Sequence, residues 1–402
     1  MKSKLKRYAM GEFSAVKHGF PFLGEFFASS GRYIVLTPGN FFEKGGFKRT
    51  PGKEKYYTSD FPSEYLCTPG DLMIAMTEQA EGLLGSTAII PEGGIYLHNQ
   101  RIGLITWDDT IVDKLYLYYL FMTRSVRKQI RDTASGTKVK HTSPERIYDV
   151  IVFIPDRDVQ KRAASLLWSI DSKIELNNRI IAELEEMAKT IYDYWFVQFD
   201  FPDKNGKPYR SSGGEMVWNE KLKRKIPKGW ESCPIGELLA KVSVTTKIQS
   251  VGYQMCGSIP VIDQSANFIA GYTDIPESVL HFTKGAVIFG DHTRIVKYVG
   301  FDFARGADGT QVLISNNACM PELLLYYSIL KIDLSNYGYA RHFKFLKETE
   351  IVVPNEGTAV SFEKVVTSLH EMITKKIFEN IELVGIRDWL LPMLMNGQVT
   401  VE

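Results

Sequence analysis

The chain has 402 residues, 44% hydrophobic and 24% charged, and its 48 basic and 47 acidic side chains give a net charge of +1. This composition excludes a disordered chain and a miniature protein, and the length allows two to four domains. The four cysteines indicate neither a zinc site nor a disulfide framework, and the apolar runs are far shorter than the roughly 20 residues that span a bilayer, so we expect a cytoplasmic protein.

The first 155 residues alternate short β-rich runs with Gly, Pro and Asn turns, and their long helical periodicity is limited to 113–131. The segment closes on the apolar run 150–154, which Pro155 ends. This pattern predicts a strand-rich mixed α/β domain.

A heptad pattern begins directly after Pro155. Apolar residues recur alternately every three and four positions between 167 and 195, with charged residues on the flanks. The pattern predicts a long helix over 156–200 that is buried along one stripe and needs a partner helix. Asn177 falls in this stripe, where it either fixes the register or faces water; both readings stay open. The predicted seam residues are Ile170, Ile174, Asn177, Ile181, Leu184 and Trp195.

The second half of the chain repeats this organisation after a Gly-, Pro- and Lys-rich connector. The predicted segments are a first domain at 1–155, a central helix at 156–200, a connector at 201–227, a second domain at 228–354 and a C-terminal helix at 355–402. The C-terminal seam residues are Ile373, Ile377, Asn380 and Val384.

Matching segments of the two halves indicate a duplication. Gly70–Ala75 matches Gly285–Gly290, and the offset between matching positions falls from 215 there to 195 at the ends of the helices. We therefore expect a mixed α/β (α+β) fold in which two strand-rich domains are separated by two long antiparallel coiled-coil helices, in a pseudo-twofold arrangement. The falling offset also predicts that the second helix is about one heptad shorter.

Charge is divided among these segments. Residues 1–155 and 202–354 carry net charges of +4 and +3, whereas 156–201 and 355–402 each carry −3. A basic surplus confined to two domains is typical of a protein that contacts DNA phosphates at two places. An excess of this size also falls within ordinary scatter, so it does not decide the question alone.

Basic, amide and aromatic residues gather in the predicted loops of both domains. Asn and Gln can read adenine through two hydrogen bonds, and Arg can read guanine in the same way. The candidate DNA-binding residues are Lys48, Arg49, Lys53, Tyr57, Asn99, Gln100, Arg101, Lys138, Lys140 and His141 in the first domain, and His292, Thr293, Arg294, Lys297, Arg305, Gln311, Tyr339, Arg341, His342 and Lys344 in the second.

The motifs of common enzymes are missing. Residues 46–53 resemble a phosphate loop, but five residues separate the two glycines instead of four, and Glu54 stands where Ser or Thr is needed. Asp291, His292 and Arg294 form either a hydrolytic cluster or a hydrogen-bonded turn, and the turn is favoured because no second acid or nucleophile accompanies them. The sequence therefore predicts no catalytic residue and no metal site.

Several segments resemble the DNA specificity subunit of type I restriction-modification systems. The resemblance covers nearly the whole chain and is most specific at 170–177, 184–188, 194–196, 226–231 and 386–399. Residues 290–294 with 306–309 look like one type of target-recognition domain, whereas the first domain matches only in its framework.

The resemblance implies a sequence-specific DNA-binding subunit without catalysis of its own. Each recognition domain would read one half of a bipartite target in double-stranded DNA, and the helices would set the spacing and dock two methyltransferase subunits. It further implies that partner subunits bind S-adenosylmethionine, ATP and magnesium, and that up to two restriction-translocase subunits join the complex. The alternative is a non-catalytic coiled-coil assembly protein whose domains bind protein or carbohydrate.

Overall fold

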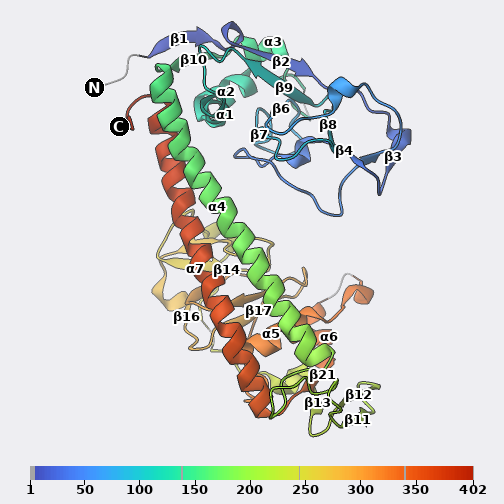
Figure 1. Ribbon diagram of the computed structural model, residues 1–402. Coiled ribbons are helices and arrows are strands. Elements are labelled where there is room, and N and C mark those ends of the chain that lie inside the picture. Colours follow the sequence, from blue (N-terminus) through green and yellow to red (C-terminus); the bar gives the residue numbers. More distant parts are fainter. Residues whose placement is uncertain (1–4, 137–138, 244, 339–340, 402) are drawn as a thin grey trace. The chain divides into compact units, whose positions relative to one another are not determined.

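The computed structural model (Figure 1) describes residues 5–136, 139–243, 245–338 and 341–401. The chain forms two compact units. Unit 1 comprises 1–175 together with 380–402, and unit 2 comprises 176–379. Both ends of the chain therefore belong to unit 1. Among the described residues, no helix is both long and apolar enough to cross a membrane.

Unit 1 contains three groups of paired strands. An antiparallel pair joins β1 (Lys6–Ala9) to β10 (Ile151–Ile154). An antiparallel sheet has the order β2 (Ser14–His18), β9 (Ile102–Trp107), β6 (Leu72–Ala75) and β7 (Thr87–Ile89). A second sheet has the order β3 (Phe27–Ala28), β5 (Tyr56–Tyr57), β4 (Tyr33–Val35) and β8 (Tyr96–Leu97), with β4 and β8 parallel.

Three short helices pack against these strands. They are α1 (Lys114–Met122), α2 (Arg124–Asp132) and α3 (Pro144–Tyr148). Asp113 caps α1 by accepting hydrogen bonds from two backbone N–H groups, and Thr123 separates α1 from α2 and caps the second helix. The periodicity over 113–131 therefore becomes two helices instead of one.

Unit 2 has a similar set of strands. β13 (Glu231–Pro234) pairs antiparallel with β21 (Glu350–Val353). A three-stranded sheet has the order β18 (Val296–Val299), β17 (Ala286–Gly290) and β20 (Thr310–Leu313). A four-stranded sheet has the order β15 (Gly271–Thr273), β14 (Ile259–Ile262), β19 (Phe303–Arg305) and β16 (Val279–Leu280). The remaining elements are the hairpin β11 (Met216–Asn219) and β12 (Arg224–Pro227), with helices α5 (Glu322–Leu330) and α6 (His342–Glu348).

The topology of the two units supports the duplication. In each, the first and last strands of the domain pair antiparallel, and a four-stranded sheet contains one parallel pair, β4 with β8 or β14 with β19. The matched segments around 70–75 and 285–290 become β6 and β17, each with a strand on either side. Short 3₁₀ helices occur at 10–12, 24–26, 38–40, 63–65, 235–238, 250–252, 276–278 and 335–337.

Two long helices are shared between the units. Helix α4 spans Arg157–Tyr192 and continues into a π-helical turn at Asp193–Val197, and α7 spans Glu356–Met395. Unit 1 contains 157–175 of α4 with 380–395 of α7, and unit 2 contains 176–192 with 356–379.

The expectation that the second helix is about one heptad shorter is wrong, because α7 has 40 residues while α4 with its π-helical turn spans 157–197, which is 41 residues. Helix α7 continues past the position that matches the end of α4. Its last residues, Leu394 and Met395, are buried in the core of unit 1, and this burial stabilises the last turn of α7.

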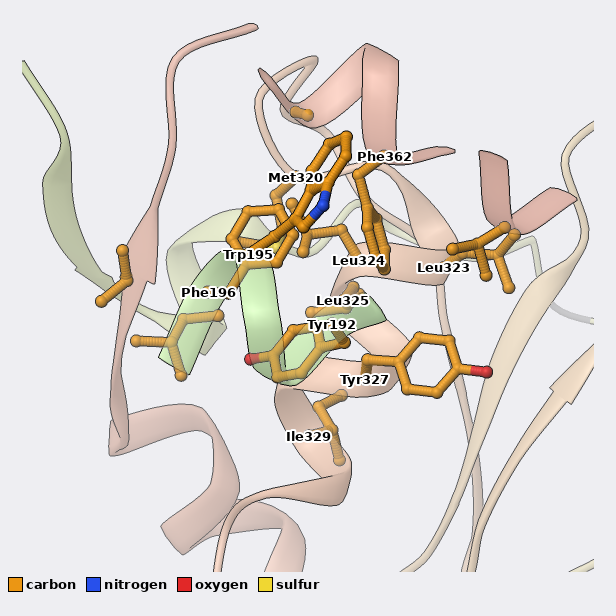
Figure 2. Packing of buried hydrophobic residues seen from close by; sticks show 14 of the residues in the cluster. Tyr192, Trp195, Phe196, Met320, Leu323, Leu324, Leu325, Tyr327, Ile329 and Phe362 are labelled. Atoms are coloured by element: carbon orange, nitrogen blue, oxygen red, sulfur yellow. The ribbon is translucent and has the colours of Figure 1, made fainter. Parts of the chain in front are cut away.

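The largest core cluster of unit 2 is aromatic (Figure 2). Figure 2 shows Trp195 and Phe196, from the end of the central helical segment, gathered around Phe362 of α7. The ring centroids of Trp195 and Phe196 lie 5.9 and 5.0 Å from that of Phe362, which has no exposed surface. Tyr192 stacks on Tyr327 of α5 at 5.8 Å. The ring of Phe362 on α7 thus packs the end of the central helical segment into the core of unit 2.

We expect Phe362→Ala to lower the free energy of unfolding of unit 2 by about 3 to 5 kcal/mol, because it opens a cavity among packed rings. Val360→Ala is the matched control, since Val360 lies on the same helix and is 55% exposed. Urea unfolding of both variants, followed by tryptophan fluorescence, measures the difference. Equal losses in the two variants would contradict the role of this ring.

A buried histidine lies beside this cluster. His370 of α7 is 8% exposed, and its Nε2 lies 2.8 Å from the hydroxyl of Tyr327. Burial lowers the pKa of His370 from 6.5 to about 4, because the charged imidazolium would lose its hydration. The folded chain therefore keeps His370 neutral at pH values where the unfolded chain protonates it.

This difference predicts an acid-sensitive contribution to stability. The contribution of His370 is complete above pH 6.5 and is lost as pH falls toward 4, since only the unfolded state takes up the proton in that window. We expect wild type to lose about 2 kcal/mol relative to His370→Gln between pH 7 and pH 5. Burial also raises the pKa of Glu363 to about 7, which acts in the opposite direction, but this effect cancels in the comparison of the two proteins. Urea unfolding of both proteins at pH 7 and pH 5 measures the difference between their free energies of unfolding. If this difference does not change with pH, the lowered pKa of His370 is contradicted.

Candidate nucleic-acid interface

The loops that carry the candidate residues of unit 2 are joined by backbone hydrogen bonds. The turn between β17 and β18 closes through Gly290 N to Ile295 O and Arg294 N to Gly290 O, both at 2.8 Å. Asp291 N donates to Gly309 O at 2.7 Å, which ties this turn to the loop between β19 and β20. Two loops far apart in the sequence therefore form one edge.

Asp291 also anchors the start of α6 to this edge. Its carboxylate accepts a hydrogen bond from Phe343 N at 2.8 Å, and its carbonyl oxygen accepts one from His342 N at 3.0 Å. Asp291 is only 6% exposed, and its carboxylate already accepts a hydrogen bond from the backbone. This geometry favours the hydrogen-bonded turn over a hydrolytic cluster. Within the described ranges, no group of three or more His, Cys, Asp or Glu side chains is placed to hold a metal ion.

Arg294 is exposed at the tip of the β17–β18 turn. Its φ of 62° is a left-handed conformation that a residue with a side chain adopts at a cost in free energy. Of the two nearby aspartates, Asp302 pairs with His281 at 2.9 Å, and the Asp291 carboxylate accepts the bond from Phe343 N. Arg294 lies near Asp333, whose pKa is lowered mainly by local hydrogen bonds and also by the charge of Arg294, but no ion pair within 4 Å joins Arg294 to another described residue, and its side chain is exposed.

Two basic candidates of unit 2 lie inside the domain. Lys297 is 6% exposed, and its ammonium group donates to Asp263 O at 2.8 Å and Asn267 O at 2.5 Å. Burial lowers the pKa of Lys297, with the nearby Asp263 carboxylate opposing the shift. His342 is 3% exposed, and its Nδ1 lies 2.9 Å from Asp291 O. Both side chains support the loops and have almost no surface to offer to DNA, contrary to the expectation from sequence.

The other candidates of unit 2 are exposed or half-buried. His292, Thr293, Arg341 and Lys344 are exposed, whereas Gln311 and Arg305 are half-buried. Burial lowers the pKa of Arg305, whose Nε is buried without an acceptor among the described residues. Tyr339 lies outside the described residues.

In unit 1, two of the three candidate loops meet at the end of β6. Met76 N donates to Arg101 O at 3.0 Å, and Thr142 N donates to Met76 O at 3.0 Å. These bonds place the turn that contains Asn99, Gln100 and Arg101 beside the loop that contains Lys140 and His141. Gln100, Arg101 and His141 are exposed there, and Asn99 and Lys140 are half-buried. Lys138 lies outside the described residues.

The third loop, 47–53, has different neighbours. Arg49 pairs with Glu92 at 2.7 Å in an exposed contact, and Lys53 is exposed. Lys48 is half-buried, with its Nζ 5.6 Å from the ring centroid of Phe42. Tyr57 is 4% exposed and packs in a small aromatic cluster, so it also has little surface for DNA, contrary to the expectation from sequence.

The helix seam lies within the cores. Ile170, Leu184, Trp195 and Ile373 are less than 10% exposed, and Ile174, Ile181, Ile377, Asn380 and Val384 are half-buried. Asn177 has no exposed surface, so the reading in which it faces water is wrong. On α4, Glu183, Glu186 and Met187 lie outside this seam and are exposed.

One polar residue at the unit 2 edge is not among those predicted from the sequence. Gln264 follows β14 and bonds to the loops at 291–294 and 306–309. Its position at the end of a strand is the signal that could have identified it, since several of the predicted residues occupy such positions.

Comparisons with known sequences agree with this picture. A family model described as the type I restriction modification DNA specificity domain matches residues 2–186. The specificity subunit of the type I restriction enzyme MjaIX from Methanocaldococcus jannaschii is 24% identical over 325 residues, which cover 76% of this chain and 73% of that protein. The specificity subunit of the type I restriction enzyme HindI from Haemophilus influenzae is 22% identical over 377 residues, which cover 76% of this chain and 81% of that protein.

A comparison with solved structures identifies the same fold. The crystal structure of the type I restriction-modification S subunit from M. genitalium matches with a TM-score of 0.63 and 14% identity, over 98% of this chain and 96% of that chain. The resemblance inferred from the sequence is thus confirmed: residues 2–186 match the type I restriction modification DNA specificity domain, and the chain is similar over most of its length to specificity subunits of type I restriction enzymes.

Proposed function

We propose that this chain gives a type I restriction-modification complex its DNA sequence specificity. The observation that supports this most directly is the duplicated domain, which in each unit presents exposed basic and amide side chains on loops tied to the ends of strands. Base edges are read by such side chains, whereas phosphate contacts provide affinity for any sequence. Each domain would read one half of a bipartite target.

The helices have a different part in this proposal. Their net negative charge suits contact with protein better than contact with phosphate, so they would dock two methyltransferase subunits and set the spacing between the half-sites. Partner subunits would supply adenine methylation and, where a nuclease is present, ATP-dependent cleavage. S-adenosylmethionine, ATP and magnesium would be bound there, in the cytoplasm. The alternative of an assembly protein that binds protein or carbohydrate has no observation in its favour.

Mapping of modified adenine tests the proposal. We expect long-read sequencing to reveal a split methylated motif in cells that contain this chain together with its methyltransferase subunits, and to lose the motif when the gene is deleted. The purified complex should bind that motif with an affinity that falls steeply as salt rises, because phosphate contacts release counterions. A methylation pattern unaffected by the deletion would contradict the proposal.

Arg294 provides a sharper test within one half-site. If its guanidinium reads a guanine, Arg294→Ala should lose about 1 to 3 kcal/mol of discrimination at a single base pair. Arg294→Lys is the matched variant, since it keeps the charge but loses the two-pronged contact. Affinities of the purified complex for the motif and its single-base variants measure both effects. A uniform loss for all sequences in Arg294→Ala, restored by Arg294→Lys, would assign Arg294 to a phosphate.

A further inference from the structure

The side chain of Gln264 joins three separate loops of unit 2. Its Oε1 accepts a hydrogen bond from His292 N at 3.1 Å, and its Nε2 donates to Asp308 O at 2.8 Å. Its main-chain oxygen accepts a bond from the hydroxyl of Thr293 at 2.7 Å. Gln264 therefore links the loop after β14 to the β17–β18 turn and to the β19–β20 loop.

The backbone around Gln264 leaves space for this amide. A Cβ added at Gly309 would lie 2.6 Å from Gln264 Nε2, and one added at Gly290 would lie 2.9 Å from Gln264 Cβ. Gly309 also has a φ of 75°, which glycine adopts most readily. Two glycines in two different loops thus permit the close approach of one side chain.

The loop that carries Gln264 is fixed from its other side. The buried ammonium group of Lys297 donates to the carbonyl oxygens of Asp263 and Asn267, on either side of Gln264. The Asp263 carboxylate accepts from Ser265 N at 2.9 Å and so closes a tight turn at Gln264. Gln264 is therefore held by a fixed loop and can in turn fix the exposed β17–β18 turn.

This turn carries His292, Thr293 and Arg294, which are all exposed. Arg294 is held in a left-handed conformation, so the direction of its side chain depends on the turn. Two of the bonds that hold the turn, to His292 N and from the Thr293 hydroxyl, end on Gln264.

We propose that Gln264 is a positioning residue for specificity, which fixes the β17–β18 turn so that Arg294 meets one base pair of its half-site. This inference rests on the proposed function. An amide is required because the site needs an acceptor for His292 N and a donor to Asp308 O in the same side chain. Loss of the amide would let the turn move, and Arg294 would then contact several bases or phosphates with similar affinity.

The test compares the methylated motif and the affinity of the full complex for wild type and three variants. Gln264→Met removes both side-chain bonds at similar volume, and Gln264→Glu keeps the acceptor but removes the donor. Gln129→Met is the matched control, because Gln129 in unit 1 also bonds to backbone through both ends of its amide, at Ile151 N and Ile151 O. Each variant is measured on the wild-type motif and on every single-base change in both half-sites.

We expect Gln264→Met to reduce discrimination by about five-fold to a hundred-fold at the positions that Arg294→Ala affects, the range of a single two-pronged base contact. Gln264→Glu should show a smaller loss at the same positions. Discrimination in the other half-site should stay within about two-fold of wild type, and Gln129→Met should alter neither half-site. When Gln264→Met is combined with Arg294→Ala, it should reduce discrimination little further, because the guanidinium that Gln264 positions is already absent.

Other outcomes would overturn the inference. Wild-type discrimination in Gln264→Met, or an equal loss in both half-sites, would reduce Gln264 to a structural residue. If Gln264→Met does not fold, wild-type discrimination by Gln264→Glu would overturn the inference in the same way. A wild-type chain that confers no split motif would overturn the proposed function itself, which separates that failure from the failure of this inference.

Discussion

Each unit of this chain depends on the burial of an apolar helix stripe contributed by segments distant in the sequence. In unit 1, the end of α7 places Leu394 and Met395 in a core built mainly from the first 170 residues, and the Tyr116 hydroxyl donates to Met395 O at 3.1 Å. Arg387 and Asp171 add an ion pair at 2.9 Å, and the hydroxyl of Tyr119 donates to the same aspartate. An exposed stripe of this kind would be costly in water, so neither core is complete without α4 and α7 together.

The cores in turn fix the loops that carry the candidate DNA-binding residues. In unit 2 the strands end in turns that are bonded to one another through Asp291, Lys297 and Gln264, which are themselves buried or half-buried. The exposed residues His292 and Arg294 are attached to this frame. Such a division suits a reader of base sequence, because a contact that discriminates between bases requires a side chain held in one position.

Much of this organisation follows from local sequence patterns. The apolar runs at 150–154 and 351–353 became β10 and β21, and the heptad spacing after Pro155 became α4, because burial periodicity is a property of neighbouring residues. The inward position of Lys297 could not be predicted in this way. A buried lysine needs acceptors for its ammonium group, and here these are the carbonyl oxygens of Asp263 and Asn267, which come from a different strand end. The hydrogen bonds of Gln264 could not be predicted in this way either, since its partners lie 28 and 44 residues away.

The burial pattern shows on which surfaces the charged side chains lie. The seam of α4 is apolar and buried, whereas Glu183 and Glu186 lie on its exposed side, so the negative charge of the helices is directed outward. In unit 2, exposed positive groups such as Arg294 lie on the loops. Phosphate would be attracted to the loops and repelled by the helices at close range, since the Debye length is only about 8 Å at physiological salt. A net charge of +1 therefore does not describe the field that a nucleic acid would meet at either surface.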